Sequence, residues 1–178
     1  MARAAELAGF FLKPVIKVEV KGNNFNRDFA KLLKTLTNKE VLVGVPAAKA
    51  NRKEPAVNNA MLAYIHDNGS PLAHIPPRPF LCAGIEQNKE QITKYMEQAG
   101  KAALDNDPAR MERALNAVGL TAQKAVRRKI QTGPFTPLKA STIAARKRKH
   151  KSRKNTSVTP LIDTGQLLQS INYVITTK

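Results

Sequence analysis

A cluster of prolines limits what the middle of this chain can form. Three prolines fall within four positions, Pro76-Pro77-Arg78-Pro79, directly before Phe80 and Leu81. Proline lacks a backbone N–H and holds φ near about −65°, so this segment cannot lie inside a helix or in a central strand. We expect a rigid extended connector over His74–Leu81, with a stiff bend that brings Phe80 and Leu81 to an apolar contact.

Hydrophobic periodicity predicts strands near both ends of the chain and helices between them. Strands are expected over Val15–Val20 and Ile171–Thr176, where apolar and polar residues alternate, and over the apolar run Val41–Val45. Apolar residues at helical spacing predict helices over Phe25–Leu36, Val57–Asp67, Gly84–Leu104 and Ala109–Ile130. Terminal strands that join one sheet make an α+β domain, with a small mixed or antiparallel sheet packed with two or three long helices.

Local signals refine these helices. Asp107 is placed to cap the helix that follows it, and Pro108 to occupy its first position. Asp163 precedes Gln166 by three residues, a capping-box-like arrangement that predicts a further short helix. Gly119 costs its helix about 1 kcal/mol relative to Ala, which indicates a close backbone contact at that point.

Positive charge is distributed unevenly along the chain. The 178 residues suit one domain over residues 15–178, preceded by an N-terminal arm at residues 1–14, and they carry a net charge of +17. Arg146–Lys154 reads RKRKHKSRK, and without its seven Lys and Arg residues the net charge would be +10. Because close like charges repel, we expect a flexible, mobile basic loop over residues 139–160, entered by a short helix that Ser141 caps.

The basic segment has two interpretations, a solvated loop or an arm that contacts phosphates. A net charge of +17 favours an acidic partner, most simply nucleic acid. No aromatic residue interrupts the run, so contacts would be with backbone phosphates, independent of sequence and sensitive to salt. The candidate contacts with DNA or an acidic partner are Arg146, Lys147, Arg148, Lys149, Lys151, Arg153 and Lys154.

Residues with catalytic or metal-binding chemistry are few. His66, His74 and Cys82 lie within seventeen residues, but their spacing matches no familiar metal motif, and nothing local pairs Cys82 with a histidine. We expect His66 to end a helix and Cys82 to be a small buried residue. The sequence therefore predicts a protein that is not an enzyme and needs no cofactor. No apolar run reaches the roughly 18–20 residues of a membrane helix.

Three segments carry a more specific pattern. They are Ala63–Ser70 with Ile75–Leu81, Gly133–Leu138 with Ser141–Lys147, and Pro160–Ile171. In this order they resemble the tail-completion and virion-morphogenesis proteins of long-tailed bacteriophages, which are small neck proteins between head and tail. Ile-Pro-x-Arg-Pro-Phe-Leu and Leu-Ile-Asp-Thr-Gly-x-Leu-x-x-Ser-Ile are the family-like blocks. The resemblance runs from about Val41 to the C-terminus and is weakest in the first fourteen residues and the lysine-rich insertion.

This resemblance implies a structural role in the virion neck, with assembly in the host cytoplasm. It implies a homo-oligomeric ring, six- or twelve-fold, that links the portal-side connector to the tail and surrounds the DNA channel. The implied partners are portal or adaptor proteins, a tail tube or tail terminator protein, and genomic DNA without sequence preference; no membrane is implied. The assembly and fold motif then comprises Arg78, Phe80, Leu81, Asp163, Thr164 and Gly165.

Two other functions stay open on the residues alone. One is a sequence-independent nucleic-acid-binding protein outside the virion, which would use residues 146–154 as its arm. The other, weaker one is an enzyme that uses His66 or Cys82.

Overall fold

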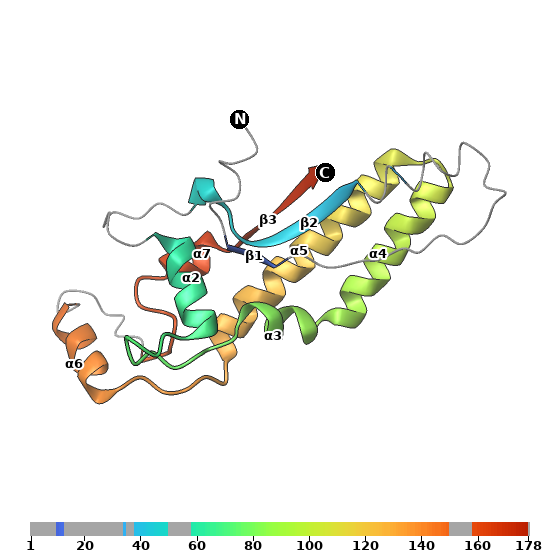
Figure 1. Ribbon diagram of the computed structural model, residues 1–178. Helices are drawn as coiled ribbons and strands as arrows, with labels where there is room; N and C mark the ends of the chain where they lie inside the picture. Colours follow the sequence, from blue (N-terminus) through green and yellow to red (C-terminus); the bar gives the residue numbers. More distant parts are fainter. Residues whose placement is uncertain (1–9, 13–33, 35–37, 50–57, 150–157, 178) are drawn as a thin grey trace.

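The computed structural model (Figure 1) describes residues 10–12, 34, 38–49, 58–149 and 158–177. Its strands are β1 (Phe10–Leu12), β2 (Lys39–Val45) and β3 (Asn172–Thr177). A short 3₁₀ helix, η2, covers Ala47–Lys49. The α-helices are α2 (Asn59–Asn68), α3 (Leu81–Glu86), α4 (Lys89–Leu104), α5 (Pro108–Thr132), α6 (Ala140–Lys149) and α7 (Gln166–Ser170). The predicted α+β class is confirmed.

The three strands form one antiparallel sheet in the order β1-β2-β3. Residues from opposite ends of the chain therefore flank the central strand β2. The predicted C-terminal strand joins the sheet as β3. Phe10 pairs with Val45, so the prediction that residues 1–14 form a separate arm is wrong for β1. Three residues are too few to show an alternating pattern. The strand predicted over Val15–Val20 and the helix predicted over Phe25–Leu36 lie outside the described residues, except Lys34.

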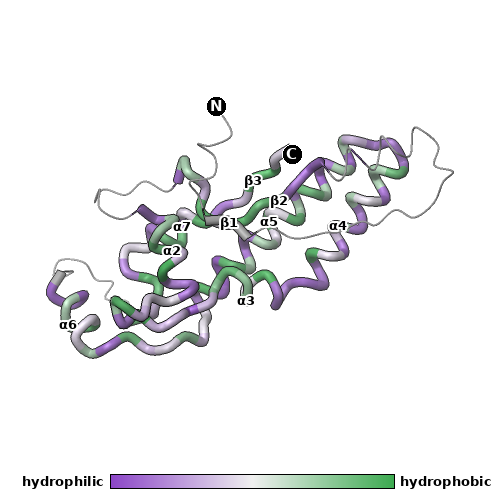
Figure 2. The backbone as a smooth tube through the Cα atoms, in the orientation of Figure 1, coloured by the Kyte–Doolittle hydropathy of each residue, from purple (hydrophilic) through white to green (hydrophobic). Residues whose placement is uncertain are grey.

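Helix α5 is the central element of the fold. In Figure 1, α3 and α4 pack along one side of it, and β2 and β3 lie on the other. Figure 2 shows hydrophilic and hydrophobic residues alternating along the α4–α5 hairpin, as expected for helices with one buried face. The predicted apolar stripe is buried: Met111, Leu115, Val118, Ala122, Val126 and Ile130. The predicted cap is present as well, since Asp107 Oδ1 accepts a hydrogen bond from Arg110 N at 2.8 Å.

Two glycines let other elements approach α5 closely. A Cβ added at Gly119 would overlap the ring of Tyr173 on β3, so the sheet packs directly on the α5 backbone. A Cβ added at Gly84 on α3 would lie 2.9 Å from Val126 Cα, closer than real Cβ contacts come. The close contact predicted at Gly119 is confirmed. On the other side of α5, Gly84 lets the backbone of α3 approach the backbone of α5 in a similar way.

The single helix predicted over Gly84–Leu104 is wrong, because the structure divides it into α3 and α4. Helix α3 begins at Leu81, and a turn at Gln87 and Asn88 separates it from α4. In the turn, Asn88 N donates to Ile85 O at 3.0 Å, and Asn88 Nδ2 donates to Gly84 O at 3.2 Å. The apolar spacing continues through this turn, so the break leaves no mark in the hydrophobic pattern.

The loop predicted over residues 139–160 is wrong for Ala140–Lys149, which form α6. The short helix expected to run into the basic segment is present, but it begins at Ala140, so Ser141 lies inside it and does not cap it. Figure 1 shows α6 at the opposite end of the molecule from the turn between α4 and α5. Residues 150–157 lie outside the described part of the chain.

Candidate functional site

The three sequence blocks line one cavity, of about 580 Å³, which we call the block cavity. The first block contributes His66, Ile75, Pro76 and Arg78. The second contributes Leu138, Thr142, Ala145 and Arg146. The third contributes Leu161, Asp163, Thr164, Gly165, Gln166 and Leu167. Segments that are far apart in the sequence thus meet at one place in the fold.

Arg78 ties the first block to the second. Its side chain is 6% exposed, and its Nε donates to Thr136 O at 3.0 Å while Nη2 approaches Pro137 O at 3.4 Å. Its backbone N–H donates to His66 O at 2.8 Å, at the end of α2. Burial, and secondarily the positive charge of Arg146, lower the pKa of Arg78 from its ordinary value. The guanidinium is thus held by carbonyl oxygens in a site poor in water.

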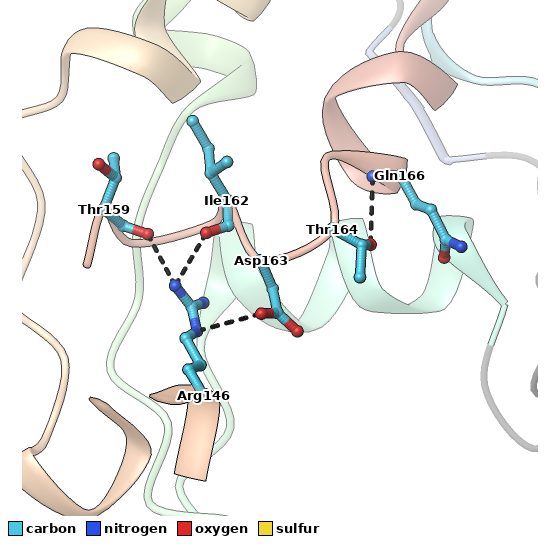
Figure 3. Close-up of polar contacts among 6 residues, drawn as sticks. All are labelled: Arg146, Thr159, Ile162, Asp163, Thr164 and Gln166. Atoms are coloured by element: carbon cyan, nitrogen blue, oxygen red, sulfur yellow. Dashed lines mark hydrogen bonds and ion pairs between the residues drawn. The ribbon is translucent and has the colours of Figure 1, made fainter. Parts of the chain in front are cut away.

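Arg146 ties the second block to the third (Figure 3). Its Nη1 donates to Thr159 O at 3.0 Å and to Ile162 O at 2.8 Å, and its Nε lies 3.7 Å from Asp163 Oδ1. These bonds explain why α6 is ordered despite its charge. Arg146 was predicted as a contact to DNA or an acidic partner, but its guanidinium is engaged within the chain, where it anchors α6.

The segment before α7 differs from the predicted capping box. The short helix predicted after Asp163 is present as α7, but its N-cap is Gly165, so the Asp163–Gln166 box is wrong. The Asp163 carboxylate lies beside Arg146. Thr164 Oγ1 is the acceptor for Gln166 N, at 3.5 Å, as Figure 3 shows. Gly165 adopts φ 78°, a left-handed conformation that suits glycine.

Phe80 and Leu81 are fully buried, so the predicted apolar contact after the prolines is confirmed. The sequence did not indicate which residue holds the backbone of Phe80 and Leu81 in place. Asp67, at the end of α2, is buried, and its Oδ1 accepts hydrogen bonds from Phe80 N at 2.8 Å and Leu81 N at 3.0 Å. These bonds satisfy amides that α3 leaves free at its start. No local spacing rule indicates a cap that lies thirteen residues away.

The remaining candidates for chemistry are spread apart. His66 lies in the last turn of α2, as predicted, and both it and the more exposed His74 line the block cavity. Cys82 is exposed, so its predicted burial is wrong, because it lies on the outer side of α3. Partial burial of the thiol, and then the negative charge of Asp67, raise the pKa of Cys82. Since the thiolate is the reactive form, this environment weakens Cys82 as a nucleophile.

Within the described ranges, no group of three His, Cys, Asp or Glu residues is arranged to hold a metal ion. In the same residues, no helix is both long and apolar enough to cross a membrane.

The predicted contact residues divide into three groups. Arg146 is an internal anchor, whereas Lys147 and Arg148 are exposed on α6. Lys149 ends α6, and Lys151, Arg153 and Lys154 lie outside the described residues.

The basic character also extends well beyond the segment first singled out. From Arg113 to Ile162 the sequence contains thirteen Lys and Arg residues and no Asp or Glu. We call this range the acid-free stretch. It includes Lys124, Arg127 and Arg128 on α5, which the focus on the densest run missed. The signal that would have found them is the length of chain without a carboxylate.

Comparisons with known proteins found no match to this chain among protein-family models, curated proteins or solved structures. What the block cavity and the acid-free stretch do must therefore follow from their geometry, their charge and the sequence blocks.

Proposed function

We propose that this protein is a structural subunit of a bacteriophage neck, a tail-completion or head–tail joining protein. In this role it assembles into a ring that links the portal-side connector to the tail and surrounds the DNA channel. One observation carries the proposal. The three blocks on which the resemblance depends line the same cavity.

Side-chain bonds between the blocks strengthen this argument. Arg78 of the first block bonds to the carbonyls of Thr136 and Pro137 in the second. Arg146 of the second bonds to Ile162 O of the third and pairs with Asp163 there. A set of blocks that forms one packed unit is what a shared family fold requires.

The charge distribution suits a ring around DNA. A ring of identical subunits multiplies the charge of the acid-free stretch, and such a positive field attracts phosphates. Phosphate contacts carry no sequence information, so DNA can slide past them while it remains bound overall. The role needs no catalytic residue and no cofactor.

A phage that encodes this protein provides the test. We expect the protein in purified particles, and we expect its deletion to yield DNA-filled heads and finished tails that stay unjoined. The wild-type gene supplied in trans should restore joining. Infectious particles of normal morphology in the deletion strain would refute the proposal.

A second candidate is a sequence-independent nucleic-acid-binding protein outside the virion. The acid-free stretch favours it, because it gives the chain a polyanion-binding surface without any assembly. This candidate predicts that the protein binds DNA as a monomer and is missing from purified particles. A ring in solution, measured by sedimentation velocity, together with presence in particles, would favour the neck role.

A further inference from the structure

We infer that a groove between the C-terminal half of α5 and helix α7 binds the phosphate backbone of double-stranded DNA. We call it the α5–α7 groove; its walls are Lys124, Arg127, Arg128, Gln131, Leu168 and Gln169. The inference deepens the proposed function, because it names the surface of the subunit that faces DNA, and it rests on that function for its place in the particle.

Five of the six side chains that line the groove end in a group that can donate hydrogen bonds to an anion, on aliphatic stems that form much of its wall. It encloses about 510 Å³, and three cations and two amides line it beside a single leucine. Lys124, Arg127 and Arg128 follow the i, i+3, i+4 spacing that places side chains on one face of a helix. Lys124, Arg128, Gln131 and Gln169 are exposed, so a ligand has direct access to them.

The cations of the groove keep their charge. Arg127 Nη2 donates to Ile171 O at 2.7 Å and to Gln169 O at 3.4 Å, which positions the guanidinium without neutralising it, because carbonyls carry no net charge. No carboxylate of the described residues forms an ion pair with Lys124, Arg127 or Arg128. Near the other end of α5, by contrast, Arg110 is paired with Asp105 at 3.1 Å.

Helix α6, which carries part of the acid-free stretch, lies in the same half of the molecule. Figure 1 shows the C-terminal half of α5, α7 and α6 on the side away from the α4–α5 turn. Lys147 and Arg148 are exposed on α6, and they add positive charge to this half of the molecule. This extended field suits a DNA duplex, which carries one negative charge per about 1.7 Å of its axis.

The composition of the groove favours DNA over an anionic membrane. Membrane-surface helices bury a large apolar face with Trp, Phe or Leu beneath their cationic face. The apolar face of α5 is instead buried in the protein core, and Leu168 is the one apolar side chain in the groove wall.

The test compares two charge-matched variants of the full-length protein. K124Q/R128Q removes two exposed cations from the groove and leaves Arg127, which bonds to the chain beside β3, intact. K94Q/K101Q removes the same charge from exposed positions of α4, each four residues after a glutamate. Binding of a labelled duplex of about 25 base pairs, chosen to exceed the footprint of one subunit, is measured by fluorescence anisotropy from 50 to 300 mM salt. Thermal unfolding monitored by circular dichroism checks that both variants fold.

We expect K124Q/R128Q to make the slope of log K against log salt shallower by about 1.8, since each phosphate contact contributes about 0.9. At 0.1 M salt the same relation gives an affinity loss of about 60-fold. K94Q/K101Q should leave the slope within error of the wild type. Equal losses in both variants would overturn the inference, because binding would then follow net charge alone.

A lipid ligand would also overturn the inference. That outcome is groove-dependent binding to phosphatidylserine-containing vesicles with no groove-dependent binding to DNA. The assay uses purified protein, so its result is independent of the particle experiment. Groove-dependent DNA binding by a protein that particles lack would uphold the groove and refute the neck role. Loss of neck assembly in the deletion strain, together with no DNA binding at the groove, would uphold the neck role and refute the groove.

Discussion

Replacing Gly119 by alanine should destabilise the protein, although alanine is the better helix former. Alanine is favoured over glycine inside a helix by about 1 kcal/mol. At Gly119, however, the new Cβ would overlap three atoms of the Tyr173 ring, so β3 or α5 must move. Gly100 on α4 is the matched control, since a Cβ there meets no atom within 4 Å.

The magnitude follows from what the methyl group displaces. Overpacking a core costs about 1–3 kcal/mol. Moving the Tyr173 ring also strains its hydrogen bond to Asn116 Oδ1, which is 3.0 Å long and contributes about 1 kcal/mol. After the gain in helix propensity, we expect G119A to lose about 2 kcal/mol and G100A to gain up to about 1 kcal/mol. For a chain of this size, the melting temperature of G119A should fall by about 4–8 °C.

The free energy of unfolding is measured by thermal and urea unfolding of G119A, G100A, Y173A and the double variant G119A/Y173A. In the Y173A background the steric conflict is gone, so G119A should become neutral or stabilising. A G119A variant as stable as G100A would refute the close packing of α5 against β3. If G119A still lowers the free energy of unfolding in the Y173A background, the steric conflict is not with the Tyr173 ring.

Three further predictions concern the block cavity and its surroundings. R78K should lower the free energy of unfolding by about 2 kcal/mol in urea titrations, because lysine cannot reproduce the bonds that the guanidinium fork makes to two carbonyls; stability equal to wild type would contradict the anchoring role. D67A should cost about 2–4 kcal/mol, since it leaves two amides at the start of α3 without an acceptor, whereas D107A removes an exposed cap and should cost about 1 kcal/mol; equal losses would contradict the buried cap. Cys82 should react slowly with iodoacetamide at neutral pH and faster as pH rises, because its raised pKa keeps the thiol protonated. D67N removes a negative charge that raises this pKa, so it should speed alkylation in folded protein; an unchanged rate would contradict the coupling.

The long elements of this fold were predictable because their patterns are long. The stripe on α5 runs from Met111 to Ile130, about five helical turns, and an aspartate followed by proline marks the start of the helix. Strand β1 was not predictable, since three residues show no period and its place depends on pairing with Val43–Val45. The break between α3 and α4 escaped notice for a different reason. The apolar spacing continues through Gln87 and Asn88, and the start of α3 at Leu81 is fixed by Asp67, which is not local.

The candidate site was only partly visible in the sequence. The blocks could be recognised, and burial of Phe80 and Leu81 followed from the stiffness of the prolines before them. Their convergence on one cavity could not be foreseen, because Arg78 and Arg146 bond to carbonyls, and every residue type has one. A run of charges shows where cations are dense, not which of them are engaged. The run therefore did not predict that Arg146 bonds within the chain and anchors α6. It also did not point to Lys124 and Arg128, which lie where cations are less dense.

A reconstruction of the neck in particles of a phage that encodes this protein tests the central claim most directly. We expect a ring of this chain, six- or twelve-fold, between the portal-side connector and the tail. Its α5–α7 groove should face the DNA density. Neck density fully explained by other proteins, with this chain missing from the particle, would contradict it.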